Sequence, residues 1–340
     1  MTDYKSLKLI ASSSPHIRTN EDTRSIMLDV IIALMPALVM GVYVFGWRAL
    51  TVTLVSVASC VVWEWLYRKV MKKSSSIGDL SAVVTGIILA MNVPVGMPLG
   101  QLIVGDLVAI VVVKQLFGGI GKNFVNPALA GRAFLLGSYA CVMTFWIDPA
   151  RNKAPLMGST VDVITHATPL SYMKNGDMAG LKEAYSLADV FLGKVGGSLG
   201  EISALLLIIG GVYLIVRKVI NWHTPVAYIV TVAVLSLLFP KAGSGVAWML
   251  YSIFGGGLML GAFFMATDYA TSPVTKKGQL IFGIGCGLLT SFIRLFGSLP
   301  EGVSFSIILM NILVPHIEHL TTPKPFGTVK EKKKKGAEKA

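Results

Sequence analysis

A polar stretch at 162–168, reading Asp-Val-Ile-Thr-His-Ala-Thr, has the residue types and spacing best suited to covalent chemistry in this chain. A threonine hydroxyl is a weak nucleophile, so its modification needs an accessible loop and neighbouring groups that orient it. We expect Thr168, followed by Pro169, to be the acceptor hydroxyl, and Asp162 and Thr165 to orient it. The alternative is a plain turn, because Asp, Thr and Pro are common turn residues.

Polar residues next to apolar stretches form a second group of candidates. Asn123 and Asn126 precede one long apolar stretch, and Asp268 follows another. Their side chains can hydrogen-bond the edge of a planar heterocycle, whereas helix capping is an equally good explanation for each Asn, and capping of the next turn is the alternative for Asp268. Arg132 lies inside an apolar stretch and needs an anionic partner, either the phosphate of a bound ligand or an aspartate.

Three more acids, Asp29, Asp79 and Asp106, lie in or at the edges of apolar stretches. Ionisable groups inside a membrane are costly and usually functional, although near helix ends they are as often solvated caps. No metal site is predicted, because His316, Glu318 and His319 close one stretch without a further ligand.

Composition sets the class of protein. Hydrophobic residues make up 54% of the chain and charged residues 14%, whereas soluble domains are about 25% charged. Ten apolar stretches have roughly the length that crosses a hydrocarbon core of about 30 Å, so the sequence predicts an all-α polytopic membrane protein. The third and sixth are short and bounded by Gly or Pro, which suggests broken or re-entrant elements. The stretches are 25–45, 49–67, 79–93, 99–117, 127–147, 202–216, 225–239, 245–266, 278–295 and 303–320.

The distribution of Lys and Arg predicts the orientation, because short loops rich in these residues stay in the cytoplasm. Segments on one side hold 21 of the 30 basic residues, with Lys114 and Arg217 among them, whereas Arg48 and Lys241 are the basic residues of short loops opposite. Both termini are therefore expected in the cytoplasm. The net charge of +12 follows from this asymmetry and requires no nucleic-acid partner.

This topology divides the chain into two membrane halves around an exterior loop. An odd number of spans in each half gives the halves opposite orientations, which suggests two inverted five-helix repeats. In such a repeat 91–94 would correspond to 266–273, and 126–127 to 300–302. The parts are a cytoplasmic segment 1–24, a first half 25–147, an extracytoplasmic loop 148–201 with Thr168, a second half 202–320 and a Lys-rich cytoplasmic tail 321–340.

Cysteine usage limits the possible electron carriers. Cys60, Cys141 and Cys286 fall in three different predicted spans. They form no Cys-x-x-Cys pair and are too few for an all-cysteine iron–sulfur site within this chain. Any electron carrier here must be organic or shared with a partner.

Longer motifs identify a family. They are SPHI at 14–17 with IMLDVIIALMP at 26–36, LFGGIGKNFVNPA at 116–128, DVITHATP at 162–169, GAFFMATD at 261–268, GVSF at 302–305 and LMN at 309–311. Together they closely resemble the family of the D subunit of the Rnf complex, the membrane-bound ferredoxin:NAD oxidoreductase. They are similar, more distantly, to the B subunit of the sodium-pumping NADH:quinone oxidoreductase. The resemblance covers 14–327, and the short segment before Ser14 favours the Rnf protein.

The resemblance implies a flavoprotein subunit that relays electrons across the membrane, coupled to translocation of Na⁺ or H⁺. The stretch 162–169 resembles the motif at which a flavin transferase joins FMN through its phosphate to a threonine, here Thr168. One departure is His166, where the family has Gly or another small residue. A second, noncovalent flavin, riboflavin in the related pump, is expected. Its expected contacts are Asn123, Asn126 and Asp268, with Arg132 available to a flavin phosphate.

The implied partners are the A and E membrane proteins of the complex, its G flavoprotein, its B and C iron–sulfur proteins, the flavin transferase and membrane lipid. The expected location is the inner membrane of a prokaryote, and activity is expected in the assembled complex rather than in this chain alone. The alternatives are the B subunit of the quinone reductase, or a solute channel or transporter of similar fold. A transporter would have no use for the exterior threonine motif.

Overall fold

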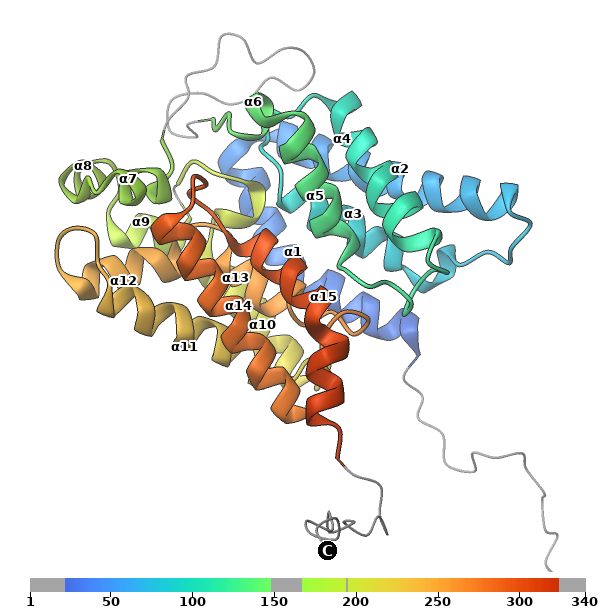
Figure 1. The fold of residues 1–340 in the computed structure, drawn as a ribbon. Coiled ribbons are helices and arrows are strands. Elements are labelled where there is room, and N and C mark those ends of the chain that lie inside the picture. The colour runs from blue at the N-terminus through green and yellow to red at the C-terminus, as the bar shows by residue number, and fades with distance from the viewer. Residues whose placement is uncertain (1–21, 148–166, 194, 324–340) are drawn as a thin grey trace, which may run out of the picture.

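The computed structural model describes residues 22–147, 167–193 and 195–323, which fold into helices joined by turns (Figure 1). The first half contains α1 (Thr23–Phe45), α2 (Trp47–Val70), the 3-10 helix η2 (Ile77–Asp79), α3 (Ser81–Met91), α4 (Leu99–Leu107), the π-helix η3 (Val108–Gln115), α5 (Pro127–Ser138) and α6 (Ala140–Met143). Three short helices follow: α7 (Pro169–Asn175), α8 (Met178–Ala184) and α9 (Leu187–Leu192). The second half contains the 3-10 helix η4 (Leu199–Glu201), α10 (Ala204–Val216), α11 (His223–Leu238), α12 (Gly245–Phe254), α13 (Leu258–Leu260), the π-helix η5 (Gly261–Met265), α14 (Lys276–Phe296) and α15 (Val303–Thr321).

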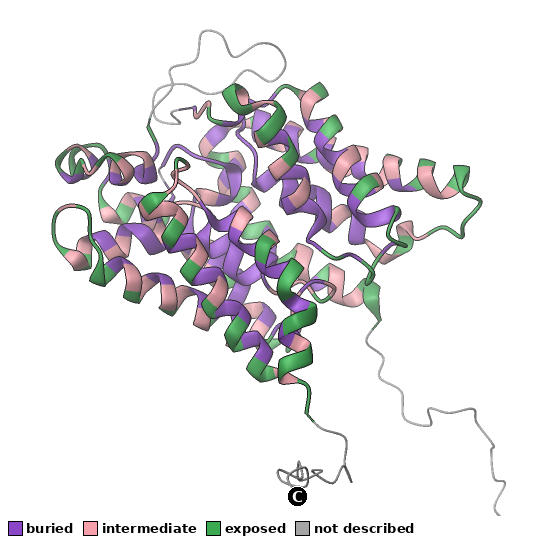
Figure 2. Cartoon of the chain, in the orientation of Figure 1, coloured by how far each residue is buried: buried purple, intermediate pink, exposed green. Residues whose placement is uncertain are grey.

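The long helices carry apolar side chains on their outer faces. On α1 the exposed residues Leu28, Ile32, Met35 and Val39 recur every three or four positions, which is the spacing of one helix face. Figure 2 shows the buried residues gathered along the inside of the bundle. Soluble monomers rarely expose such large apolar surfaces, so these faces meet lipid. The chain is an all-α polytopic membrane protein, as its composition predicts.

Each of the ten predicted stretches contains helix, but the helices differ in length. α1, α2, α14 and α15 are long and apolar enough to cross a bilayer as single helices, and α12 with α13 and η5 forms a fifth, bent candidate. α3, α10 and α11 are apolar but shorter. Ten complete crossings and the inverted relation of the two halves stay predictions.

Interruptions also lie where the sequence analysis does not predict them. The third and sixth stretches, predicted to be broken, are the short helices α3 and α10. The sharp bend, 61°, falls in the eighth stretch between α12 and α13. The fourth and eighth stretches contain the π-helices η3 and η5. π-helical turns occur frequently at functional sites. The region between η3 and η5 is therefore a candidate functional site.

The two halves meet in the centre of the bundle. α1 packs along α10, where a Cβ added at Gly210 would lie 2.2 Å from the carbonyl oxygen of Ala33. The ends of α3 and η5 also touch, because Asn92 Nδ2 lies 3.2 Å from Met265 Sδ. The third and eighth stretches, which the proposed repeat treats as counterparts, are therefore in direct contact.

Of two basic residues that the sequence analysis assigns to cytoplasmic loops, Lys114 lies inside the bundle, whereas Arg217 is exposed at the end of α10 and pairs with an acid of α1. Lys114 lies on η3 with 2% of its side chain exposed, and its Nζ is 2.6 Å from Glu64 Oε2 on α2. Arg217 follows the last turn of α10, and its Nη2 is 3.0 Å from Asp29 Oδ2 on α1. The prediction for Lys114 is wrong because an ion pair inside the protein, rather than contact with water, determines where this ammonium lies.

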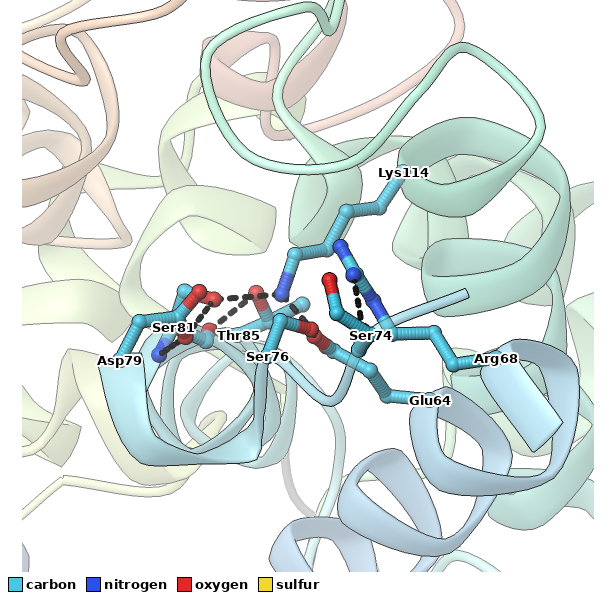
Figure 3. A network of polar contacts seen from close by, with 8 residues as sticks. All are labelled: Glu64, Arg68, Ser74, Ser76, Asp79, Ser81, Thr85 and Lys114. Atoms are coloured by element: carbon cyan, nitrogen blue, oxygen red, sulfur yellow. Dashed lines mark hydrogen bonds and ion pairs between the residues drawn. The ribbon is translucent and has the colours of Figure 1, made fainter. Parts of the chain in front are cut away.

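The Lys114 ammonium connects three helical elements (Figure 3). It also donates to Ser81 Oγ at 2.6 Å, and Ser81 Oγ donates to Asp79 Oδ1 at 2.5 Å. The second oxygen of Glu64 accepts a hydrogen bond from Ser76. Burying two charges is expensive unless each is paired and hydrogen-bonded. This network meets that condition and fixes η3 against α2 and the start of α3.

Close contact between α1 and α10 makes Gly210 sensitive to added volume. Gly210→Ala is expected to lower the free energy of unfolding by about 1–3 kcal/mol, because the new methyl group overlaps a backbone oxygen. The matched control is Gly137→Ala on α5, where a Cβ meets nothing within 4 Å. A denaturant titration in detergent, followed by circular dichroism, measures both. Equal stability of the two variants would contradict the packing described here.

The Lys114–Glu64 pair gives a second stability prediction. Lys114→Met leaves a buried carboxylate without its cation and is expected to cost about 3–5 kcal/mol of unfolding free energy. Lys114→Met combined with Glu64→Gln removes both charges and is expected to recover most of that loss. The same titration compares the single and double variants. If the double variant is less stable than Lys114→Met alone, Glu64 and Lys114 do not stabilise each other as an ion pair.

Candidate functional site

A cavity of about 100 Å³ opens where the two halves meet, and it contains the polar residues that the sequence analysis singled out next to apolar stretches. Asn123, Asn126 and Asp268 all line it. Its walls come from α1, α3, the start of α5, the end of α10 and η5, with Phe263 and Phe264 among the apolar residues. Sites that bind small molecules are mostly apolar, with a few convergent polar groups. The lining of this cavity fits that description.

Asn123 lines this cavity and has a buried side-chain oxygen without a hydrogen-bond partner among the described residues. The residue is 8% exposed, and its Oδ1 makes no hydrogen bond within the described structure. The turn before it contains Gly118, Gly119 and Gly121, all with positive φ, a conformation that favours glycine. Because an unpaired buried carbonyl oxygen costs free energy, this atom is available to a hydrogen-bond donor on a ligand.

Asn126 is the helix cap that one of the two sequence interpretations predicts. Its Oδ1 accepts hydrogen bonds from the backbone N–H groups of Ala128 at 3.1 Å and Leu129 at 3.4 Å, at the start of α5. Its Nδ2 donates to the carbonyl oxygen of Met265 at 3.3 Å. Asn126 therefore joins α5 to the end of η5, and its contribution to the cavity is chiefly to hold these two walls together.

Asp268 follows η5 and lies in the turn that closes one side of the cavity. Its Oδ2 accepts a hydrogen bond from Thr271 Oγ1 at 3.1 Å. Burial raises the pKa of the Asp268 carboxyl above its ordinary value, and the hydrogen bond from Thr271 works in the opposite direction. Lys114 and Ser81 of the buried network line the same cavity. The cavity therefore combines a carboxyl group, an ammonium group and two amides within apolar walls.

Thr168, the predicted acceptor, lies in a separate region. It precedes α7, has 6% of its surface exposed, and its Oγ1 is 2.9 Å from Ser171 Oγ. Its hydroxyl is thus close to a second hydroxyl that can act as donor or acceptor. Asp162 and Thr165, as well as His166, lie outside the described residues.

The segment around Thr168 is a small helical cap rather than an irregular loop. α7, α8 and α9 enclose a cluster of apolar side chains that packs against α12. Tyr185 donates to the carbonyl oxygen of Ala167 at 3.2 Å, and Tyr251 on α12 donates to that of Tyr185 at 2.9 Å. In Figure 1 the cap lies on the far side of the bundle from the start of α1 and the end of α15.

Arg132 finds its anionic partner within the protein. On α5, its guanidinium bonds Glu301 and Ser304, and Glu301 Oε1 accepts a hydrogen bond from the N–H of Gly257 at 2.8 Å. Arg132 lines a different cavity from that of Asn123. The partner is thus a glutamate, where the sequence analysis named a phosphate or an aspartate. A role for Arg132 toward a flavin phosphate stays a prediction.

Two glutamates near this arginine have unusual acidities. Burial by itself would raise the pKa of Glu301, but the Arg132 guanidinium outweighs burial and holds that pKa below its ordinary value. Burial, and then the nearby carboxylate of Glu301, raise the pKa of Glu201 to about 8. The group ties α5 to the bend between α12 and α13 through Gly257.

Sequence reasoning missed Glu64 and the ionic role of Lys114, although signals for both were present. Glu64 lies inside the predicted stretch 49–67, where an acid needs a compensating partner. Lys114 lies inside the predicted stretch 99–117 and so is within reach of the bundle. The sequence offered less indication that Glu301 is paired, because it falls in a turn, where an acid is usually solvated.

Comparison with known proteins covers nearly the whole chain. A sequence model of the NQR2, RnfD, RnfE family matches residues 10–327. The D subunit of the Na⁺-translocating ferredoxin:NAD⁺ oxidoreductase complex of Acetobacterium woodii is 48% identical over 96% of this chain and 98% of its own. The D subunit of the proton-translocating ferredoxin:NAD⁺ oxidoreductase complex of Clostridium ljungdahlii is 43% identical over 93% and 96%. The D subunit of the ion-translocating oxidoreductase complex of Actinobacillus succinogenes is 36% identical over 93% and 97%. The chain therefore belongs to the NQR2, RnfD, RnfE family.

Proposed function

We propose that this chain is the D subunit of an Rnf complex, and that it relays electrons between ferredoxin and NAD⁺ in a process coupled to ion translocation. Relatives at 48% and 43% identity are named as such subunits, and each aligns over nearly its full length. The observation that carries the proposal is the cavity between the two halves, where Asn123, Asn126 and Asp268 come together from distant parts of the chain.

The residues that line the cavity suit a noncovalent flavin, with riboflavin as the expected one, and its ring system would have to widen a space of about 100 Å³. A flavin supplies one- and two-electron transfer when it is bound. The unpaired Oδ1 of Asn123 suits the ring N–H of an isoalloxazine, and the phenylalanines suit its flat apolar faces. Lys114 lines the same cavity as a buried cation. Glu64 offsets most of this charge, so Lys114 would act toward a ligand as a hydrogen-bond donor, with one N–H left after Glu64 and Ser81.

A covalent FMN at Thr168 is the second cofactor of this proposal. Thr168 would hold it as a phosphoester, with Asp162 and Thr165 orienting the hydroxyl. Because the Thr168 side chain is buried and bonded to Ser171, a flavin transferase would need the turn before α7 to open, or would act before the cap packs onto α12. Holding the acceptor on a short helical cap keeps it close to the bundle once the modification is complete.

The proposed setting is the inner membrane of a prokaryote, with both termini in the cytoplasm and residues 148–201 outside. The A, B, C, E and G proteins of the complex would be the partners, together with the flavin transferase and lipid. The start of α1 and the end of α15 lie on one side of the bundle and α7–α9 on the other (Figure 1), an arrangement that supports one location for both termini and another for Thr168.

Two variants are expected to remove the two flavins independently. Thr168→Ala removes the acceptor hydroxyl and should abolish covalent flavin while keeping the noncovalent one. Asn123→Leu should do the reverse, lowering noncovalent flavin affinity by about tenfold or more, because a buried hydrogen-bond acceptor is lost. Fluorescence of the denatured protein on a gel measures the covalent flavin, and chromatography of the acid supernatant measures the other.

Ser171→Ala is the matched control for Thr168, since it leaves the acceptor in place and is expected to keep covalent flavin. Asn123→Asp is the control for Asn123→Leu, because it keeps a side-chain oxygen that can accept a hydrogen bond. Covalent flavin in Thr168→Ala, or unchanged noncovalent flavin in Asn123→Leu, would contradict the corresponding assignment.

The orientation predicts opposite labelling of two exposed lysine positions. Lys72 follows α2 and Lys182 lies on α8, and both are exposed. In a background with the exposed Cys141 changed to Ser, a membrane-impermeant thiol reagent added to spheroplasts is expected to label Lys182→Cys and to spare Lys72→Cys. The reverse pattern would place the termini outside. Permeabilised cells, in which both positions should react, provide the control.

A further inference from the structure

Asp106 is a fully buried acid that the flavin assignments leave unused. It lies on α4, two residues before the start of η3, and has no exposed surface. It is surrounded by α2, where Ser56 Oγ is 2.7 Å from its Oδ1 and Cys60 Sγ is 3.4 Å from the same oxygen. Ser59 Oγ, also on α2, bonds its Oδ2. The carboxyl is thus contacted by neutral groups.

The hydrogens available to this cluster are fewer than its oxygens require. Ser56 Oγ is within bonding distance of Asp106 Oδ1 and also of the carbonyl oxygen of Gly86, at 3.0 Å. Ser59 Oγ similarly reaches both Asp106 and the carbonyl oxygen of Ser56, the latter at 3.1 Å. Each serine hydroxyl has one hydrogen to donate. Even with the thiol hydrogen of Cys60, the oxygen acceptors outnumber the hydrogens, so the cluster can accept one additional hydrogen or cation.

Charge compensation sets Asp106 apart from the other charged residues buried within the long apolar stretches that the structure describes. Asp29 pairs with Arg217, Glu64 with Lys114, and Arg132 with Glu301. Arg48 donates to the carbonyl oxygens of Val95 and Met97. Within the described residues, Asp106 has no cationic partner at salt-bridge distance. An isolated carboxylate in a low-dielectric interior is very costly, so this group requires a bound proton or metal cation.

A cluster of hydroxyl groups in the second half joins three helices without any charged residue, and it serves as a comparison for Asp106. Tyr228 on α11, Thr290 on α14 and Ser306 on α15 are buried and bond one another at 2.6, 2.7 and 3.1 Å. The three groups are neutral, and Ser306 donates onward to the carbonyl oxygen of Val303. Helices here can be joined by hydroxyl groups alone, so an acid at Asp106 is not required for packing.

We propose that Asp106, with Ser56, Ser59 and the carbonyl oxygen of Gly86, forms an exchangeable site for one monovalent cation, either H⁺ or Na⁺. Carboxylate, hydroxyl and carbonyl oxygens are the ligands of hard cations, and they suit a proton equally well. This site deepens the proposed function, on which it rests, by naming where an ion is taken up inside the membrane.

The site is connected to the cavity along a single helix. α4 continues directly into η3, and Lys114, eight residues after Asp106, lines the cavity. At about 1.5 Å per residue the two positions are about 12 Å apart along the axis. At that distance, and an effective dielectric constant of about 20, one unit charge changes the affinity for a cation by about tenfold. Negative charge entering the cavity would therefore favour cation uptake at Asp106.

The titratable groups that face Asp106 are few. α2 presents Cys60 and, further along, Glu64, which is neutralised by Lys114 of η3. α3 presents Thr85 and Gly86, which carry no charge, and the charged residue of α5, Arg132, is bound to Glu301. The net charge of this region therefore depends on whether Asp106 has bound a cation.

Carbodiimide labelling of the purified complex tests the site without relying on activity. Such reagents modify protonated carboxyl groups in apolar surroundings, and mass spectrometry locates the modified peptide. We expect Asp106 to be labelled in the absence of Na⁺, with labelling falling as the pH rises. Suppression by NaCl, but not by KCl, at fixed pH would identify Na⁺ as the occupant, whereas dependence on pH alone would identify H⁺. An Asp106 that stays unlabelled at every pH and Na⁺ concentration would overturn the proposal.

Variants then connect the site to transport. In proteoliposomes containing the assembled complex, Asp106→Asn is expected to lower coupled ion uptake by about tenfold or more, with both flavins retained. Ser59→Ala keeps the carboxyl group and is expected to raise the cation concentration for half-maximal uptake by about tenfold. Tyr228→Phe, in the neutral cluster, is the control and should transport normally. Normal uptake by Asp106→Asn would refute the site, whereas a lack of flavin in the unmodified protein would refute the proposed function instead.

Discussion

Compensation of buried polar groups by the protein itself is the constraint on which this structure depends. The core of a bilayer supplies no water, so ionic and hydrogen-bonding groups must find partners within the bundle. Lys114 meets this requirement by joining η3 to α2 and α3, and Arg132 meets it by joining α5 to the turn that contains Glu301. These contacts connect segments far apart in sequence. The bundle is therefore organised around its charges as much as around its apolar packing.

The candidate flavin cavity results from helices that end inside the molecule. α3 and α5 begin beside it, α10 ends beside it, and η5 gives way there to the turn with Asp268. Helix ends leave backbone groups and capping side chains available. The side chain of Asn126 accepts a hydrogen bond from the first turn of α5, whereas the side-chain oxygen of Asn123 has no hydrogen-bond partner in the described part of the chain. A ligand at this position would complete hydrogen bonding that the protein leaves unfinished, which is the physical basis for assigning a cofactor to it.

The proposed electron carriers and the proposed cation site occupy different parts of one electrostatic system. Thr168 belongs to the cap over α12, the cavity lies between the halves, and Asp106 lies within the first half. An electron that moves between carriers in a low-dielectric interior changes the free energy of every nearby charge. Since the pairs at Glu64 and Asp29 are already neutralised, an acid with variable occupancy is the group best able to respond. Coupling of this kind needs no large movement of the helices.

The sequence by itself determined the class of protein, the family and the residues that line the cavity. Composition and ten apolar stretches were sufficient for the class, and the motifs at 116–128 and 261–268 contain Asn123, Asn126 and Asp268. These features are local, because hydrophobic length and short motifs can be read without knowing what packs against them. For the same reason, the sequence suggested that Asn126 caps a helix but left the choice between capping and ligand binding open.

Only the tertiary structure decided which charges are paired. Lys114 and Arg217 lie near or just beyond the ends of predicted stretches, and their partners Glu64 and Asp29 lie 50 and 188 positions away. The bend between α12 and α13, the helical cap around Thr168 and the isolation of Asp106 are likewise set by contacts between distant segments. Electrostatic compensation depends on distance in space, and a linear sequence does not specify that distance until the helices have packed.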